Sequence, residues 1–129
     1  MVAFLSESWI ALLDEAARRL PAPTESLVVT QIVTGEPAAR YHLLLAPSGC
    51  RVEPGDVPDP DLEFEVDVPT AVRLARGEEN AQRALAEGRL KVRGRMERLV
   101  AIGDFLSRLE DIYASVRGST DYPQAPGAD

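Results

Sequence analysis

Five acidic side chains alternate along one stretch of the sequence, and carboxylates in a row suggest a calcium site. They are Asp59, Asp61, Glu63, Glu65 and Asp67. Side chains two residues apart on a strand point to one face about 7 Å apart, so they form a row and not a cage. No EF-hand spacing accompanies them. We therefore interpret the series as the wet face of a half-buried strand and expect no metal there.

The chain holds one histidine, His42, and one cysteine, Cys50. A structural zinc ion takes four ligands, mostly of these two types, so a zinc site is not expected. The sequence also lacks a G-x-S-x-G elbow, a Walker loop and a G-x-G-x-x-G turn. We expect no catalytic residue, no cofactor and no enzymatic activity. His42 alternates with apolar neighbours, which predicts an exposed position on the sheet.

Composition limits the class of protein. The chain has 129 residues, 45% of them hydrophobic, and a net charge of −7, which fits one globular domain and argues against nucleic acid as a partner. No apolar stretch is long enough to span a membrane, and the start lacks the basic segment of a signal peptide. The single cysteine fits a reducing cytosol, so a cytoplasmic location is expected. All but one of the 14 basic residues are arginine, which suggests a GC-rich bacterial genome.

Apolar residues that alternate or recur at three and four predict the order helix, three strands, crossover, strand, two short helices, strand and helix. Short turns between the first three strands favour an antiparallel meander. We expect an α+β fold with a five-stranded, mostly antiparallel sheet covered on one face by helices. The domain should span residues 1–117 and a flexible tail residues 118–129. The expected helices cover 6–20, 69–76, 81–87 and 95–116, and the strands cover 27–34, 40–46, 50–53, 62–68 and 90–93.

One stretch carries the most specific spacing. It contains Gly77, Asn80, Ala81, Ala84, Gly88, Leu90, Lys91, Val92 and Gly94. The glycines can end helices and turns, and Asn80 can cap a helix, so these residues specify the fold and do no chemistry themselves. This pattern resembles the signature region of the sterol carrier protein type 2 family, and the likeness covers roughly residues 4–117.

The resemblance implies an apolar tunnel between sheet and helices. That family binds sterols, fatty acids, fatty acyl-CoA or phospholipids without covalent chemistry. Its site has no invariant polar ligand to carry over, so the lining is inferred here from amphipathic patterns, with core packing as the alternative for each residue. Gly103 interrupts the last helix, which suggests a close approach, a bend or room for a ligand. The inferred lining residues are Trp9, Leu13, Val72, Leu85, Leu90, Met96, Leu99, Ile102, Phe105, Leu106 and Leu109.

A run of bases follows this motif and permits two interpretations. Alternating bases on a strand form a solvated face, or they form a docking site for anionic headgroups or CoA phosphates. The docking hypothesis requires the acidic stretch from Glu53 to Asp67 to face elsewhere. It fails if the two stretches neutralise one another across neighbouring strands. The run comprises Arg89, Lys91, Arg93, Arg95 and Arg98.

Two functions remain open. The first is a carrier that binds or transfers a lipid or fatty acyl ligand and touches an anionic membrane transiently. The second is an accessory module that serves a partner enzyme and presents a lipid or quinone intermediate. A homodimer is compatible with either. A dry core with an exposed apolar patch would favour the second function, and an open apolar cavity the first.

Overall fold

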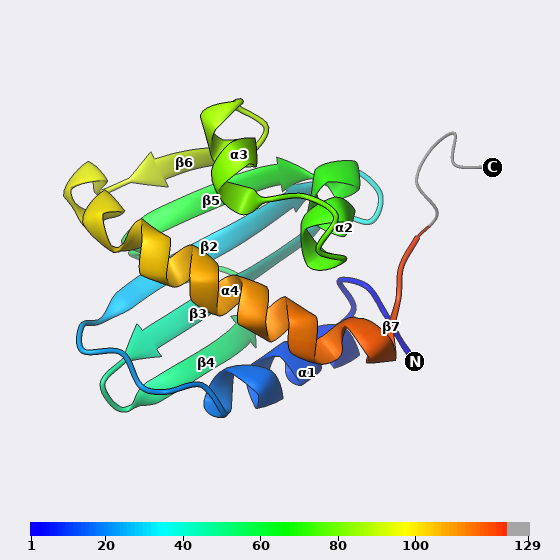
Figure 1. The fold of residues 1–129 in the computed structure, drawn as a ribbon, viewed down its shortest axis with the longest axis horizontal. Coiled ribbons are helices and arrows are strands. Elements are labelled where there is room, and N and C mark those ends of the chain that lie inside the picture. The colour runs from blue at the N-terminus through cyan, green and yellow to red at the C-terminus, as the bar shows by residue number, and fades with distance from the viewer. Residues whose placement is uncertain (124–129) are drawn as a thin grey trace.

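A five-stranded sheet forms the base of the fold in the computed structural model, which describes residues 1–123 (Figure 1). Its order is β4 (Gly49–Pro54), β3 (Ala39–Ala46), β2 (Leu27–Thr34), β5 (Leu62–Asp67) and β6 (Lys91–Gly94). The first three strands form the predicted antiparallel meander, and β6 is antiparallel to β5. Only β5 runs parallel to its neighbour β2 within this sheet. The expected α+β class with a mostly antiparallel sheet is confirmed.

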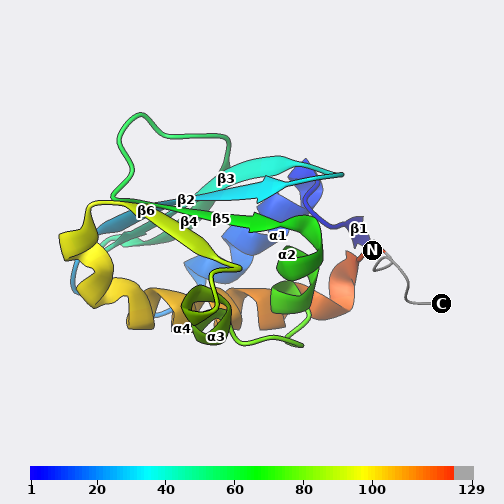
Figure 2. The ribbon, with the colours of Figure 1, turned by 90° about the horizontal axis from the view of Figure 1, so that it is seen from above.

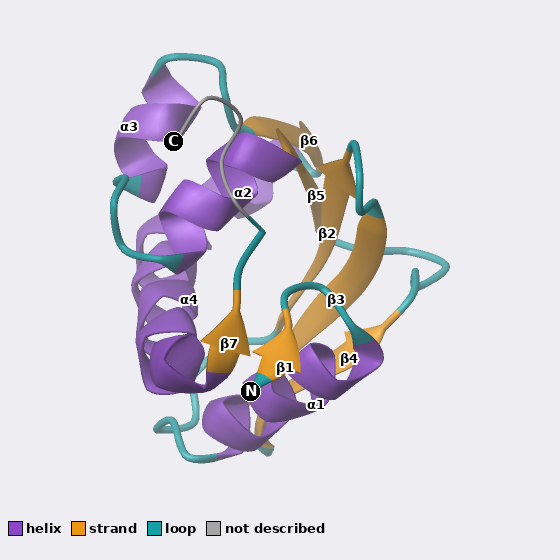
Figure 3. Cartoon of the chain, turned by 90° about the vertical axis from the view of Figure 1, so that its right-hand side faces the viewer, coloured by secondary structure: helices purple, strands orange, loops and turns teal. Residues whose placement is uncertain are grey.

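Four α-helices cover one face of this sheet (Figures 2 and 3). They are α1 (Glu7–Arg18), α2 (Val68–Ala75), α3 (Ala81–Ala86) and α4 (Ile102–Val116). Helix α1 packs against β4 and α4, whereas α2 packs against β5. Within residues 1–123, no helix combines the length and the apolar character needed to cross a membrane.

Short polar side chains begin three of these helices. Ser6 accepts a hydrogen bond from the backbone N–H of Trp9 at 3.2 Å, and Asp67 accepts one from Thr70 at 2.9 Å. The Asn80 side chain accepts from two backbone N–H groups at the start of α3. Each bond satisfies a donor that the first helical turn leaves unpaired. The cap predicted at Asn80 is confirmed.

The last helix begins later than the sequence predicts. A 3-10 helix, η1 (Met96–Ala101), precedes α4 in place of its expected first turns. This segment has no side-chain cap and lies past the end of β6 (Figure 1). Met96 is 48% exposed and Val100 91% exposed. The prediction of one continuous helix over 95–116 is therefore wrong at its start.

The C-terminal segment remains part of the fold beyond residue 117. A 3-10 turn, η2 (Arg117–Ser119), leads into β7 (Thr120–Asp121), which pairs in parallel with β1 (Val2–Ala3). Thr120 is buried and its hydroxyl donates to the Val116 carbonyl at 2.7 Å. Thr120 and Asp121 of the predicted tail thus pair with the N-terminal strand, and residues 124–129 lie outside the described part of the chain.

The loop over residues 55–61 crosses the face of the sheet that the helices leave uncovered (Figure 2). Its ends are held by backbone bonds from Gly55 to Arg40 and from Asp61 to Val28. A ring nitrogen of His42, Nδ1, lies 2.8 Å from the Gly55 carbonyl oxygen, and the side chain is buried. The prediction of an exposed His42 is therefore wrong, because alternation identifies the face but not the loop that covers it.

Asp14 joins α1 to the edge strand β4. Its Oδ1 accepts from the backbone N–H of Val52 and from Arg51, both at 2.9 Å, and Oδ2 lies 2.8 Å from Arg18. Burial acts to raise the pKa of Asp14, but these hydrogen bonds and charges outweigh it and lower the pKa below its usual value. The ionised carboxylate is therefore a contact that stabilises the helix–sheet edge.

We expect Asp14→Asn to lower the free energy of unfolding by about 1.5 kcal/mol at pH 7, measured by urea denaturation. A lowered pKa in the folded state gives stability that is present above about pH 4 and lost as the pH falls. The difference from wild type should therefore shrink below pH 4. Glu15→Gln, at an exposed neighbour on α1, is the control and should have little effect. A difference that stays constant from pH 7 to pH 3 would contradict this assignment.

Candidate functional site

A cavity of about 500 Å³ lies between the inner face of the sheet, α2, α4 and the residues that join α2 to α3. Side chains from three central strands form its floor, and α2 and α4 form its walls. Its volume falls within the range of small-molecule sites. The floor comprises Gln31, Val33, Tyr41, Phe64 and Val66; the helical walls comprise Ala71, Leu74, Gly103, Leu106, Ser107, Leu109, Glu110, Asp111 and Tyr113.

Small residues in the helices keep this space open. Helix α2 presents Ala71 to the cavity, and α4 presents Gly103, where a Cβ atom would meet no other atom within 4 Å. Among the alternatives left open for Gly103, the structure shows space beside it and no close backbone. Gly103 and Ser107 lie one turn apart and are both exposed, so they mark the opening on the α4 side.

Arg117 positions the opposite rim of the opening. Its Nε donates to the Ala75 carbonyl at 2.7 Å, and Nη2 donates to Glu110 at 2.6 Å. The guanidinium lies over Gly77, where a Cβ atom would come within 2.8 Å of it. Gly77 also has a φ of +76°, a backbone conformation that favours glycine here. This contact ties the loop after α2 to the end of α4.

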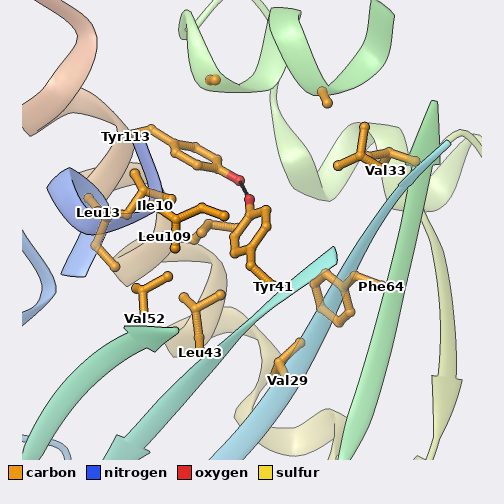
Figure 4. Packing of buried hydrophobic residues seen from close by; sticks show 14 of the residues in the cluster. Ile10, Leu13, Val29, Val33, Tyr41, Leu43, Val52, Phe64, Leu109 and Tyr113 are labelled. Carbon is orange, nitrogen blue, oxygen red and sulfur yellow. Dashed lines mark hydrogen bonds between the residues drawn. The ribbon is translucent and has the colours of Figure 1, made fainter. Parts of the chain in front are cut away.

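Two tyrosine hydroxyls meet inside the cavity. Tyr41 rises from β3 toward Tyr113 of α4, and their oxygens lie 2.9 Å apart (Figure 4). Burial raises the pKa of Tyr113 to about 12 and raises the pKa of Tyr41 well above its usual value. Both phenols therefore stay neutral at physiological pH. The pair joins the sheet to α4 through a buried hydrogen bond.

Gln31 is the other polar residue on the cavity floor. It is 4% exposed and lies in the middle of β2, between Tyr41 on β3 and Phe64 on β5 in register. Its Nε2 atom has no hydrogen-bond partner among residues 1–123. A buried amide without a partner is costly, so Gln31 is an unusual choice for a position that simple packing would fill with an apolar side chain.

Acidic side chains surround the opening. Among the residues that line the cavity in the described part of the chain, none is lysine or arginine. The nearby arginines instead form ion pairs with acids of the rim. Arg76 lies 3.1 Å from Glu78, Arg73 lies 3.1 Å from Glu79, and Arg89 also pairs with Glu79. The opening thus offers no uncompensated positive charge to an anionic ligand. The acids at the rim are Glu78, Glu79, Glu110 and Asp111.

The structure separates the predicted lining residues into three groups. Three lie in the cavity wall: Leu90, Leu106 and Leu109. Four are buried in the core away from it: Trp9, Leu13, Val72 and Phe105, of which Trp9 packs on Tyr41 and Phe105 on Phe64. The rest are Leu85, Leu99 and Ile102, which are partly buried against the core, and Met96, which is exposed. Ligand contact by any of them remains a prediction.

Sequence reasoning missed the polar residues of the cavity. Gln31 has a signal in the sequence, because it occupies the inward phase of β2 between Val29 and Val33. Tyr41 has the same inward phase but is indistinguishable from a core residue. The acids of the rim come from a loop and from α4, and their proximity depends on how α4 crosses the sheet.

The basic run does not face away from the acidic stretch. Strand β6 pairs directly with β5, which sets Lys91 opposite Glu65 and Arg93 opposite Glu63. Each of the four arginines also forms an ion pair. The condition for a docking site is therefore not met, because the two stretches neutralise one another across neighbouring strands. The pairs include Arg89–Glu79, Arg93–Glu65 at 3.0 Å, Arg95–Asp59 at 2.6 Å, Arg95–Asp61 at 3.0 Å and Arg98–Asp61 at 4.0 Å.

Comparison with known proteins identifies relatives of this fold. A sequence model of the SCP-2 sterol transfer family matches residues 10–107. A crystal structure of sterol carrier protein 2 is similar with a TM-score of 0.66 and 16% identity, covering 88% of this chain and 97% of that one. The solution structure of palmitated SCP2L2 from Aedes aegypti has a TM-score of 0.62 and 15% identity, covering 80% and 95%. The ubiquinone synthesis protein UbiJ-SCP2 has a TM-score of 0.52 and 16% identity, covering 83% and 90%. No curated protein matches the sequence.

The tyrosine pair predicts a loss of stability in alkaline solution. Because both pKa values are raised in the folded state, the contribution of each hydroxyl is present below pH 10 and is lost as the pH rises, through about 12 for Tyr113. We expect the unfolding free energy of wild type to fall above pH 10. In the double variant Tyr41→Phe/Tyr113→Phe this fall should be less steep, by up to about 1.4 kcal/mol per pH unit for each tyrosine removed. Urea denaturation at pH 9 to 11.5 measures this. An equal fall in the double variant and in wild type would count against it.

Proposed function

This chain belongs to the SCP-2 sterol transfer family, and we propose that it binds an apolar lipid in the cavity between sheet and helices and carries it without covalent chemistry. The observation that supports this function most is the cavity itself, about 500 Å³ in volume and open at one side between α4 and the loop after α2. A fold that needed only a core would bring α2 and α4 closer over the sheet. Palmitate on the similar Aedes aegypti protein supports the same use of the fold.

Burial of hydrocarbon would drive this binding. Each methylene that leaves water contributes about 0.8 kcal/mol, so ten methylenes would contribute about 8 kcal/mol before the entropic costs of association. The floor supplies apolar contacts through Val33, Phe64 and Val66. An apolar wall discriminates weakly between chains of similar length. We therefore propose a carrier of broad rather than narrow specificity.

The charge at the opening narrows the ligand class. Acids line the opening, and the arginines beside it are paired. A CoA group or an anionic phospholipid headgroup would find the arginines beside the opening already paired with Glu78, Glu79 and Glu110, so it would gain no free positive charge there. Of the four ligand classes that the resemblance implies, sterol-like molecules therefore fit this opening best, and a fatty acid fits it in its neutral, protonated form. The proposal no longer includes the docking of anionic headgroups at Arg89–Arg98.

An accessory role for a partner enzyme is the second candidate function. Two observations favour it: exposed apolar side chains at Met96 and Val100, and the fold's likeness to the ubiquinone synthesis protein UbiJ-SCP2. An accessory module could still hold a lipid or quinone intermediate in the same cavity. The open cavity favours the carrier function over a module with a dry core. Both proposals place the protein in the cytoplasm.

Uptake of a fluorescent alkyl probe tests the carrier function. We expect a pyrene-labelled fatty acid to bind the wild-type protein, and Gly103→Leu to weaken this binding about tenfold or more, because the new side chain occupies the opening. Leucine is also a better helix former than glycine, so the variant should not unfold. Ala114→Leu is the matched control, since residue 114 is exposed on α4 outside the cavity lining.

The two variants separate the outcomes. Weakened uptake in Gly103→Leu with normal uptake in Ala114→Leu would support the cavity as the binding site. Equal binding in both would show that the probe sits elsewhere on the protein. If the wild-type protein takes up no probe, the carrier function is wrong, and recovery of a stoichiometric partner enzyme by affinity purification would then favour the accessory role.

A further inference from the structure

The buried amide of Gln31 stands out because it faces an apolar cavity. Its strand neighbours on the same face, Val29 and Val33, are apolar, and the residue is 4% exposed. Gln31 itself lines the cavity, and its Nε2 has no hydrogen-bond partner within residues 1–123. The amide of Gln31 therefore keeps a donor for which the described residues supply no acceptor, in a residue that lines the cavity.

The tyrosine pair supplies a second donor beside it. Tyr41 lies directly opposite Gln31 in the β2–β3 register, and side chains of such a pair are close neighbours on one face. Tyr41 and Tyr113 carry two hydroxyl protons, but the bond between their oxygens uses only one. The other proton has no acceptor among the described residues. Because both phenols stay neutral, this proton remains available at physiological pH.

We propose that Gln31 and the Tyr41–Tyr113 pair form a binding subsite for a neutral oxygen of the ligand, a carbonyl or hydroxyl group, at the floor of the cavity. The ligand would enter with this oxygen first, and its hydrocarbon would fill the space toward the opening. This inference rests on the proposed function, because it concerns the ligand of the same cavity. It narrows the ligand from any apolar lipid to a long-chain alcohol, ketone or sterol-like alcohol.

Charge explains why the oxygen should be neutral. Both donors are uncharged, and within the described residues the cavity is lined by four acids and by no base. A carboxylate at the floor would lose its hydration without gaining an ion pair, which is unfavourable in an apolar site. A ketone or an alcohol needs only the hydrogen bonds that the amide and the phenol offer. A fatty acid would enter in its protonated form.

A matched pair of probes tests this subsite. 2-Hexadecanone and n-hexadecane have the same number of carbons and differ in one carbonyl oxygen. Each would compete with an alkyl-pyrene probe for wild type, Gln31→Leu and Thr30→Val. Thr30, the neighbour of Gln31 on β2, is the control. It is also buried, and its hydroxyl has no hydrogen-bond partner within residues 1–123. Unlike Gln31, it does not line the cavity.

We expect wild type to prefer the ketone about tenfold, the effect of one well-made hydrogen bond to a buried donor. Gln31→Leu should reduce this preference to near unity while it retains binding of hexadecane. It should also raise the melting temperature, because leucine removes an unsatisfied amide. A residue that only supported the fold would lower it. Thr30→Val should keep the wild-type preference. Tyr113→Phe should lose part of that preference, and it serves as the test variant if Gln31→Leu cannot be purified.

The outcomes distinguish this inference from the proposed function. If wild type binds both probes equally, the subsite is wrong and the carrier function stands. If Gln31→Leu keeps the tenfold preference, another group recognises the oxygen and the assignment is overturned. If wild type binds neither probe and does not bind the alkyl-pyrene, the carrier function is wrong and the subsite is overturned with it.

Discussion

The inner face of the sheet must be covered, and the way it is covered leaves the cavity. Leu43 of β3 and Val29 of β2 are apolar and almost completely buried, and the same holds for Phe64 of β5. Helix α1 covers the β4 side and α2 the β5 side, while α4 crosses between them (Figure 3). Small residues in α2 and α4, Ala71 and Gly103, leave unfilled the space beside them that larger side chains would occupy. The space that remains is a product of the same packing that stabilises the fold.

The polar groups in this cavity lower the stability of the ligand-free fold, and the proposed role for them is ligand recognition. The unpartnered amide of Gln31 and the extra proton of the Tyr41–Tyr113 pair would each be better satisfied in water than in an empty apolar cavity. Gly103 similarly weakens α4 relative to alanine. These three departures from simple packing meet in one cavity, whereas the caps at Ser6, Asp67 and Asn80 follow ordinary rules. Departures that gather in one place are typical of a binding site.

Local signals in the sequence predict most of the helices and the five main strands, but not the site. Strand β2 was predicted with both ends correct, and Asn80 was predicted as a cap, because alternation and capping depend on adjacent residues. Whether Leu106 meets the cavity and Phe105 the core depends on how α4 crosses the sheet, which adjacent residues do not determine. The pairing of Arg93 with Glu65 depends on β6 lying beside β5, a contact between distant residues. Contacts between distant residues therefore determine which residues line the cavity, where it opens, and that the bases of the predicted docking site are paired with acids.

Contacts between a bound lipid and the protein would test the central claim most directly. Nuclear Overhauser effects can be recorded between 1-hexadecanol and the methyl groups of the protein in solution. The carrier account predicts contacts from the alkyl chain to Val33, Leu106 and Leu109, which line the cavity. Contacts confined to the exposed segment around Met96 and Val100 would contradict it, because the lipid would then lie on the surface. So would the absence of any contact at saturating hexadecanol.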